Sequence, residues 1–235
     1  MYKTLAAGCV YVCMEWLTLY KGGTGEIEEK KSRFIAAVRP VHTEEEALAF
    51  VAAMKKKYWN ASHNCYAYVI GDRQNLQRCS DDGEPQGTAG RPMLDVLLGE
   101  HVTDVVCVVT RYFGGTLLGT GGLVRAYSKA VQEGLRGSRV LTKKHGYRFK
   151  IRTNYTDLGK IQYLLGQRSI PIMDSVYAQD VQTEVVAADD AREELLNALT
   201  EATGARAEYL DMEEVFYAEG EKLPILLGQE QDPKE

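Results

Sequence analysis

Three segments of the chain gather residue types that can do chemistry. They are 61–68 (ASHNCYAY), 80–90 (SDDGEPQGTAG) and 110–127 (TRYFGGTLLGTGGLVRAY). The carboxylates of Asp81, Asp82 and Glu84 carry negative charge within a few positions of one another. With His63 they could ligate a hard cation, or share a proton as general acid and base.

The acidic segment also suits a simple turn, because Asp side chains bond neighbouring backbone amides. Its spacing differs from that of a calcium loop, and no second His or Cys stands at zinc-like spacing from His63. We therefore predict no metal and no other cofactor. Instead we expect a salt bridge that closes this surface, from Asp81 or Glu84 to an arginine. The two candidate arginines are Arg111 and Arg125.

Glycine is concentrated in one part of the chain. Nine of the 22 glycines lie between positions 83 and 122, where even scattering would place about four. The stretch from Gly114 and Gly115 to Gly122 predicts a turn into a helix, whose free N–H groups suit an anion. Arg111 and Arg125 would add bidentate phosphate donors. The stretch matches neither a Walker loop nor GxGxxG, so close packing explains the glycines equally well.

Nucleophilic catalysis has little support in the sequence. Cys65 and His63 alternate along an expected strand entry, so a Cys–His pair would need one side chain to turn back. Cys107 lies in an apolar run and is expected in the core. Ser80 has no neighbouring base. We expect a protein without catalytic residues.

The charge of the chain is unevenly distributed. The net charge of −5 argues against a general nucleic-acid coat protein. From position 134 to 156, however, there is no acidic residue, and basic residues recur. We call five of them the basic stripe: Lys143, Lys144, Arg148, Lys150 and Arg152. Such a stripe could contact a phosphate backbone, or could be a solvated linker.

Composition and chain ends bear on where the protein acts. The apolar and charged fractions are those of a soluble globular protein, and no apolar run reaches the roughly 18–20 residues of a membrane span. Five scattered cysteines indicate reduced thiols, hence a cytoplasmic protein. Residues 5–9 resemble a lipoprotein cleavage site, but too few residues precede them for a signal peptide. Residues 1–25 are expected to be an extension, with Met1 or Met14 as the native start.

Hydrophobic periodicity predicts two successive units. The first is expected to contain strand 26–39, a helix opened by a Thr43/Glu46 capping box, strands 65–71 and 76–80, a short helix from Pro92 to Gly99, buried strand 105–109 and helix 123–133. The second is expected to contain strand 147–152 with one basic face, helix 157–165, strands 170–178 and 181–187, helix 189–204 and strand 205–216. This β-α-β-β-α-β order is the ferredoxin-like plan.

The three segments together form a specific pattern. They contain A-[ST]-H-N-C, S-D-D-G-E-P-x-G-T-A-G-x-P and V-x-R-Y-F-G-G-x-x-L-G-x-G-G-L-x-R-A-Y, with Ser62 where many relatives have Thr. On these residues the chain resembles the YigZ/YvyE branch of the IMPACT family. The resemblance implies an α+β protein. A ribosomal-protein-like, left-handed βαβ domain would span 26–140, a ferredoxin-like domain similar to one in elongation factor G would span 141–220, and a polar tail 221–235.

The resemblance also implies a role. Eukaryotic members of this family are linked to translational control, and the family has no settled catalytic activity. We therefore expect a non-enzymatic, translation-associated regulator that contacts the ribosome, RNA or a translation-factor protein, without a membrane and without a motif for sequence-specific DNA binding. The alternative is a phospholigand-binding domain or enzyme that uses the glycine-rich segment as an anion site. The expected binding surface comprises His63, Asn64, Asp81, Asp82, Glu84, Arg111, Gly114, Gly115 and Arg125.

Overall fold

The computed structural model describes residues 16–71, 74–220 and 223–227. The chain divides into two compact units, residues 1–142 and residues 143–235. We call them the first and second units. The expected boundary lay between residues 140 and 141. Met1, Met14, Cys9 and Cys13, on which the expectations about the native start and the thiols partly rested, lie outside the described residues.

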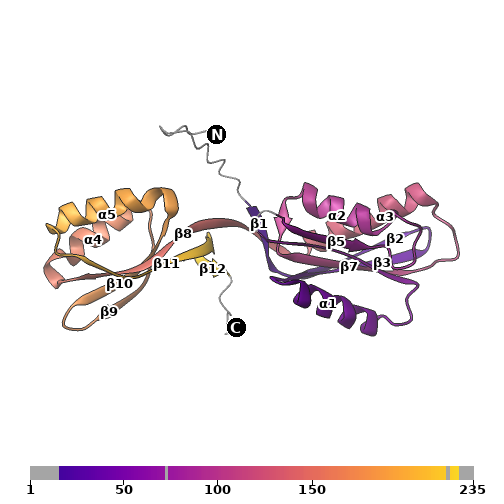
Figure 1. Ribbon diagram of the computed structural model, residues 1–235, viewed down its shortest axis with the longest axis horizontal. Coiled ribbons are helices and arrows are strands. Elements are labelled where there is room, and N and C mark those ends of the chain that lie inside the picture. Colours follow the sequence, from indigo (N-terminus) through magenta and orange to yellow (C-terminus); the bar gives the residue numbers. More distant parts are fainter. Residues whose placement is uncertain (1–15, 72–73, 221–222, 228–235) are drawn as a thin grey trace. The chain divides into compact units, whose positions relative to one another are not determined.

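The first unit is built on a five-stranded antiparallel sheet in the order β2-β3-β7-β4-β5. Its elements are β1 (Trp16–Lys21), β2 (Gly23–Glu29), β3 (Ser32–Pro40), α1 (Glu44–Lys57), β4 (His63–Ile70), β5 (Leu76–Ser80), α2 (Gly90–Gly99), β6 (Val102–Thr103), β7 (Val105–Tyr112) and α3 (Thr120–Arg136). Helix α1 covers one face of the sheet, and α2 and α3 cover the other (Figure 1). β1 pairs in parallel with β6, so residues 16–25 of the expected extension belong to this fold.

The central strand β7 confirms the prediction of a strand buried on both faces. Val105, Cys107 and Val109 pack into the core under α2 and α3. Val106 and Val108, which alternate with them, pack into the core under α1. A continuous apolar run is required here because successive side chains of a strand enter opposite cores.

The expected single strand 26–39 is wrong, because the chain folds back on itself within it. β2 and β3 form a hairpin whose two turn residues, Lys30 and Lys31, have φ of 48° and 65°. Positive φ at both turn positions matches the right-handed twist of the flanking strands. Asn-Gly usually marks such turns. Two lysines there give no comparable sequence signal.

The expected cap of α1 is present with one change. The Thr43 hydroxyl accepts a hydrogen bond from the Glu46 backbone N–H at 3.2 Å. The Glu46 carboxylate accepts from the backbone N–H of His42 at 2.7 Å, one residue before the cap. The helix therefore starts where the sequence predicts, and two backbone N–H groups at its start have side-chain acceptors.

The second unit has the β-α-β-β-α-β order predicted from the sequence. Its elements are β8 (Arg139–Thr153), which contains the boundary between the units, α4 (Tyr155–Gln167), β9 (Ile172–Tyr177), β10 (Val181–Ala188), α5 (Asp189–Thr203), β11 (Glu208–Ala218) and β12 (Ile225–Leu227). The strands lie in the order β11-β8-β10-β9, and the pairs between them are antiparallel. Residues 225–227 of the expected polar tail form β12, which pairs with Phe216–Ala218 of β11.

The two units together confirm the α+β fold class. The second core lies between the sheet and the helices α4 and α5, and contains Phe149, Ile151, Ile161 and Leu195. No helix in the described part of the chain is both long enough and apolar enough to span a bilayer.

Candidate functional site

The candidate site lies at one end of the first unit's sheet, which we call the sheet end. β3 and β4 begin there and β7 ends there, because Arg111 of β7 is paired with Phe34 on one side and with His63 on the other. The β2–β3 turn, residues 58–62, the acidic loop (residues 81–89) and the glycine loop (residues 113–119) meet at this end. The three sequence segments that could do chemistry are therefore brought together by the sheet register.

A buried ion pair joins the acidic loop to β7. Arg111 donates from Nη1 to Oε1 of Glu84 at 2.6 Å, and the two side chains are only 7% and 3% exposed. The Tyr127 hydroxyl of α3 donates to the same carboxylate oxygen at 2.8 Å. This confirms the expected salt bridge. Its position inside the unit means that it holds the loop in place, because neither charge faces solvent.

The Arg111 guanidinium is also packed between two aromatic rings. It lies 5.4 Å from the ring centroid of Phe34 and 5.6 Å from that of Phe113. The Arg111 Nε atom is buried and makes no hydrogen bond. The sequence predicted that Arg111 donates hydrogen bonds to a phosphate. Its burial instead makes it a structural residue that supports the ring of Phe113 at the surface.

His63 and Cys65 lie on the same face of β4, because residues two apart in a strand point the same way. The expectation that one side chain must turn back was wrong. The His63 ring Nδ1 lies 2.9 Å from the Asp82 carbonyl oxygen, and the Cys65 sulfur lies 3.0 Å from that of Asp81. Both side chains thus face the acidic loop.

The chemistry of Cys65 argues against nucleophilic catalysis. Burial raises the pKa of its thiol to about 12, so the thiolate that would attack a substrate is not formed near neutral pH. Its neighbour, the Tyr127 hydroxyl, lies 3.3 Å away. Burial likewise raises the pKa of Tyr127 above its ordinary value, so the phenol stays protonated and donates to Glu84.

The other carboxylates of the acidic loop also point inward. Asp81 accepts hydrogen bonds from the backbone N–H groups of Gly87, Ala89 and Gly90 at 2.8–3.0 Å, and so caps the start of α2. Burial opposes the ionisation of Asp81, but the three backbone donors outweigh it and hold the pKa of its carboxyl below the usual value. The alternative of a turn stabilised by Asp is therefore the one that the geometry favours.

Asp82 and Asn64 fasten the loop to β4. Asp82 Oδ2 accepts from the Asn64 backbone N–H at 2.7 Å, and its Oδ1 pairs with Lys55 of α1 at 2.5 Å. Asn64 is buried, and its side-chain oxygen accepts from the Thr110 hydroxyl at 2.7 Å. Among the described residues no group of three or more His, Cys, Asp or Glu is placed to hold a metal ion.

The glycine loop crosses the sheet end between β7 and α3. A Cβ at Gly114 would lie 2.1 Å from the Lys31 carbonyl carbon, so the close approach of two backbones requires glycine there. Gly115 has a φ of 81° and lies at an exposed position. Packing thus accounts for Gly114 and conformation for Gly115.

Arg125 differs from Arg111 in its surroundings. Its side chain is exposed on the second turn of α3, and no ion pair is assigned to it in the described part of the chain. Of the two arginines predicted to meet a ligand, Arg125 alone presents its charge to solvent.

The basic stripe is in place, but its charges are compensated. Basic side chains of β8 face acidic residues on the neighbouring strands, on the turn before β10 and just after the end of β11. The pairs are Lys144 with Glu219, Arg148 with Glu184 and Glu213, Lys150 with Asp211, and Arg152 with Asp180 and Glu208. Lys143 lies over the Phe216 ring at 4.3 Å. The expected positive stripe is therefore a charge-paired face of the second sheet.

The charge of each unit leads to the same result. Residues 1–142 carry 17 Lys and Arg against 15 Asp and Glu, whereas residues 143–235 carry 11 against 18. The acidic balance of the chain thus resides in the unit that contains the whole basic stripe. The formal net charges of +2 and −7 therefore favour the first unit over the second for contact with a polyanion.

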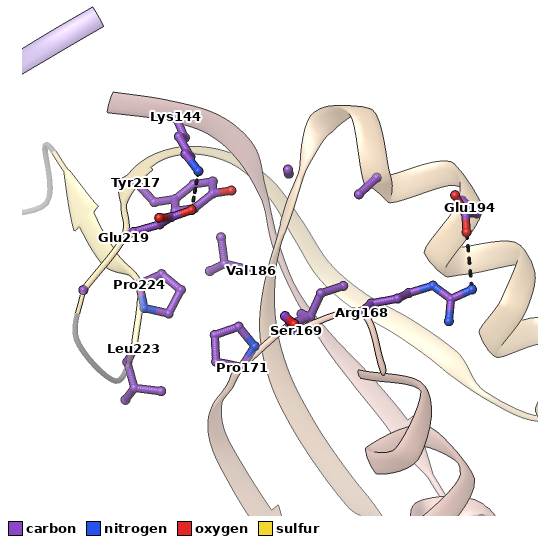
Figure 2. Close-up of a pocket in the computed structure, with 14 residues that line it drawn as sticks. Lys144, Arg168, Ser169, Pro171, Val186, Glu194, Tyr217, Glu219, Leu223 and Pro224 are labelled. Carbon is purple, nitrogen blue, oxygen red and sulfur yellow. Dashed lines mark hydrogen bonds and ion pairs between the residues drawn. The ribbon is translucent and has the colours of Figure 1, made fainter. Parts of the chain in front are cut away.

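The second unit contains a pocket of about 570 Å³, shown in Figure 2. Two ion pairs lie at its edges, Lys144 with Glu219 and Arg168 with Glu194. Apolar side chains, including Val186, complete the lining. Of the predicted site residues, Lys144 alone lines this pocket. The other predicted residues lie elsewhere.

The sequence analysis missed several residues of the sheet end. Ser32 and Ser62 accept hydrogen bonds from the Gly114 and Phe113 backbone N–H groups at 3.1 and 3.2 Å, which anchors the glycine loop. Trp59, in the segment after α1, is 82% exposed. A tryptophan among polar loop residues is a signal that the sequence offered, because large aromatic side chains are usually buried.

Comparisons with known proteins match both units. The model of the Impact N-terminal domain matches residues 30–135, and a domain of unknown function (DUF1949) matches residues 151–206. The IMPACT family member YvyE of Bacillus subtilis (strain 168) is 42% identical over 193 residues, which cover 82% of this chain and 89% of that protein. The IMPACT family member YigZ of Escherichia coli (strain K12) is 43% identical over 152 residues, covering 64% of this chain and 74% of that protein.

Solved structures similar to this chain include one that spans both units. A crystal structure of a hypothetical protein aligns with a TM-score of 0.55 and 37% sequence identity, and the alignment covers 85% of this chain and 98% of that one.

Proposed function

Because this chain belongs to the IMPACT family, we propose that it is a non-enzymatic regulator that acts in translation in the cytoplasm, by contacting the ribosome, RNA or a translation factor. The family resemblance supplies the link to translation. The sheet end of the first unit supplies the surface, and one observation carries the assignment. The carboxylates of the acidic loop make contacts within the unit, whereas side chains such as Arg125 are exposed to solvent.

The carboxylates and the thiol that could take part in catalysis point into the unit. Glu84 is buried against Arg111 and Tyr127, and Asp81 is held by backbone N–H groups. A general acid or base must instead reach the proton that it transfers. The Cys65 thiol is buried with a raised pKa. The site is thus built as a supported surface rather than as a reaction centre.

A second candidate function is supported by a different observation. Helix α3 begins after Gly119 without a side-chain cap and without an acidic residue in its first turn. Its free N–H groups and the nearby Arg125 would suit a phosphate group. The alternative of a phospholigand-binding domain rests on this helix start. Thermal unfolding in the presence of nucleotides tests it, because a ligand that binds the folded state raises the melting temperature.

Purified ribosomes and a cell-free translation reaction test the leading proposal. We expect the chain to pellet with ribosomes or their subunits through a sucrose cushion, less so as salt rises. Added to translation of a reporter, it is expected to change the rate of synthesis. The variant Lys56→Gln/Arg125→Gln, which removes two exposed charges of the first unit, is expected to weaken both effects. A chain that stays in the supernatant at low salt and leaves the rate unchanged would contradict the proposal.

A further inference from the structure

We propose that the sheet end binds single-stranded RNA, with bases stacked on exposed aromatic side chains. This inference deepens the proposed function and rests on it. The surface is an apolar band formed by Trp59 of the 58–62 segment, Phe113 and Leu117 of the glycine loop, and Val124 of α3.

Exposure is the first observation. The described part of the first unit has five exposed large hydrophobic side chains, and four of them form the apolar band; the fifth is Leu48 on α1. Trp59 is 82% exposed, Leu117 81% and Phe113 49%. Single exposed apolar residues are common on any protein, but exposed apolar residues gathered in one region indicate a contact surface.

The band is held by hydrogen bonds rather than left loose. The Ser62 backbone N–H donates to the Arg111 carbonyl at 2.9 Å, and its hydroxyl accepts from the Phe113 N–H at 3.2 Å. The Tyr112 hydroxyl lies 3.0 Å from the Asn60 side-chain oxygen. The segment that carries Trp59 and the start of the glycine loop are thus fastened to each other. Backbone segments held in place lose little freedom when a ligand binds.

The Phe113 ring has a charged support. The Arg111 guanidinium lies 5.6 Å from its centroid and is itself held by Glu84. One face of Phe113 is therefore engaged by the protein, and the ring is still 49% exposed. A ring presented in this way is a platform on which a planar base can stack.

The charges around the band favour a polyanion. Lys56, at the end of α1, precedes Trp59 by three residues, and Arg125 directly follows Val124 on α3; both side chains are exposed. In the acidic loop, Asp82 pairs with Lys55 and Glu84 with Arg111, and the Asp81 carboxylate turns inward to backbone N–H groups of the unit. Lys30 and Lys31 in the β2–β3 turn stand beside Glu28 and Glu29, so that turn contributes no net charge. Lys56 and Arg125 are thus exposed cations close in sequence to residues of the band, in the unit with more basic than acidic residues.

Stacking on flat rings favours RNA over a protein partner. Trp and Phe supply planar faces, and cations at separate places along the band can follow a sugar-phosphate backbone. A single strand is required, because the bases of a duplex are already stacked on one another and cannot lie on the rings.

Tryptophan fluorescence tests the proposal directly. The chain contains two tryptophans, so Trp16→Phe leaves Trp59 as the reporter in an otherwise complete chain. We expect a dodecamer of single-stranded RNA to quench this fluorescence to saturation, and the same sequence as a duplex to do so far less. Binding by variants of Trp59 is measured by the fluorescence anisotropy of a labelled RNA. Trp59→Leu should weaken the affinity about 5- to 150-fold, and Trp59→Phe should weaken it less because a flat ring is kept.

Two further variant pairs separate stacking from charge. Phe113→Leu should weaken binding, whereas Leu48→Ala, which changes the exposed hydrophobic outside the band, should leave it unchanged. Lys56→Gln and Arg125→Gln should each lower the slope of log K against log salt by about 0.7. The matched control Arg136→Gln lies at the other end of α3, where Arg136 pairs with Glu133, and should leave the slope unchanged.

The outcomes distinguish this inference from the proposed function. If the chain pellets with ribosomes but does not bind the RNA dodecamer, a protein partner is indicated, the stacking proposal fails and the proposed function stands. The stacking proposal is also overturned if the Trp59→Leu and Phe113→Leu chains bind the RNA as tightly as the chain without these changes, or if duplex RNA binds as tightly as single-stranded RNA. Absence of RNA binding, ribosome pelleting and any effect on translation overturns both.

Discussion

Arg111 and Glu84 form a buried ion pair, with Nη1 of the arginine 2.6 Å from Oε1 of the glutamate. The residues are 27 positions apart and join the end of β7 to the acidic loop. The pair therefore fixes the acidic loop, which carries three carboxylates, against the end of β7. The neighbouring Phe113 ring is held at the surface by the same guanidinium.

Breaking this pair from one side should be costly. Glu84→Gln leaves the charge of Arg111 buried without its partner, and Arg111→Met leaves the charge of Glu84 buried without its partner. Each variant should lower the free energy of unfolding by about 3–5 kcal/mol. The double variant should lose much less than the sum, because no unpaired charge remains. Urea denaturation of the four proteins measures this, with Lys150→Gln as an exposed-pair control. Additive losses would show that the two charges do not interact.

Asp81 should make stability depend on pH in the acidic range. A carboxyl whose pKa is lower in the folded than in the unfolded chain stabilises the fold above its unfolded value, and this contribution is lost as pH falls through the folded value. Asp81→Asn should therefore cost about 1–2 kcal/mol at pH 7, and the difference should shrink below about pH 4. Thermal melts across pH measure it.

Asp95→Asn is the matched control for that series. Asp95 is on the same helix that Asp81 caps, but its ion pair with Arg91 is exposed, so its loss should cost at most about 1 kcal/mol. A difference between wild type and Asp81→Asn that is constant from pH 7 to pH 3 would show that ionised Asp81 does not cap α2.

Gly114 should not tolerate a side chain. A Cβ would lie 2.1 Å from the Lys31 carbonyl carbon and 2.2 Å from its oxygen, which are backbone atoms that cannot rotate away. Gly114→Ala should therefore destabilise the chain by about 3 kcal/mol. Gly99→Ala is the control: nothing lies within 4 Å of that Cβ, and alanine favours the end of α2. Unchanged denaturation of Gly114→Ala would mean that the two backbones are not in contact.

Neutralising the basic stripe should leave RNA and ribosome binding intact. In Arg148→Gln/Lys150→Gln/Arg152→Gln the lost charges are those already paired with acidic residues on neighbouring strands. Stability should fall by no more than about 1 kcal/mol per pair. Pelleting with ribosomes measures the effect, beside Lys56→Gln/Arg125→Gln. Strong loss of binding in the triple variant would return the stripe to the binding surface.

Local patterns were predicted well from the sequence. The Thr43 cap, the doubly buried strand β7 and the basic face of β8 follow from periodicities and caps that span two to four residues. The β2–β3 hairpin was missed because its turn uses Lys30 and Lys31 in place of the usual turn residues. The strand β12 was missed because it is a three-residue strand that depends on its pairing with β11.

The sequence by itself determined the α+β class, the β-α-β-β-α-β order of the second unit, and the pairing of an acidic-loop carboxylate with an arginine. Only the tertiary structure decided which charges reach solvent. Arg148 meets Glu184 and Glu213, 36 and 65 positions away, through the register of a sheet, and Asp81 turns toward α2 because the loop folds back on that helix. Such partners are distant along the chain, so the run of basic residues predicted a positive stripe, whereas the sheet register paired most of its charges with carboxylates.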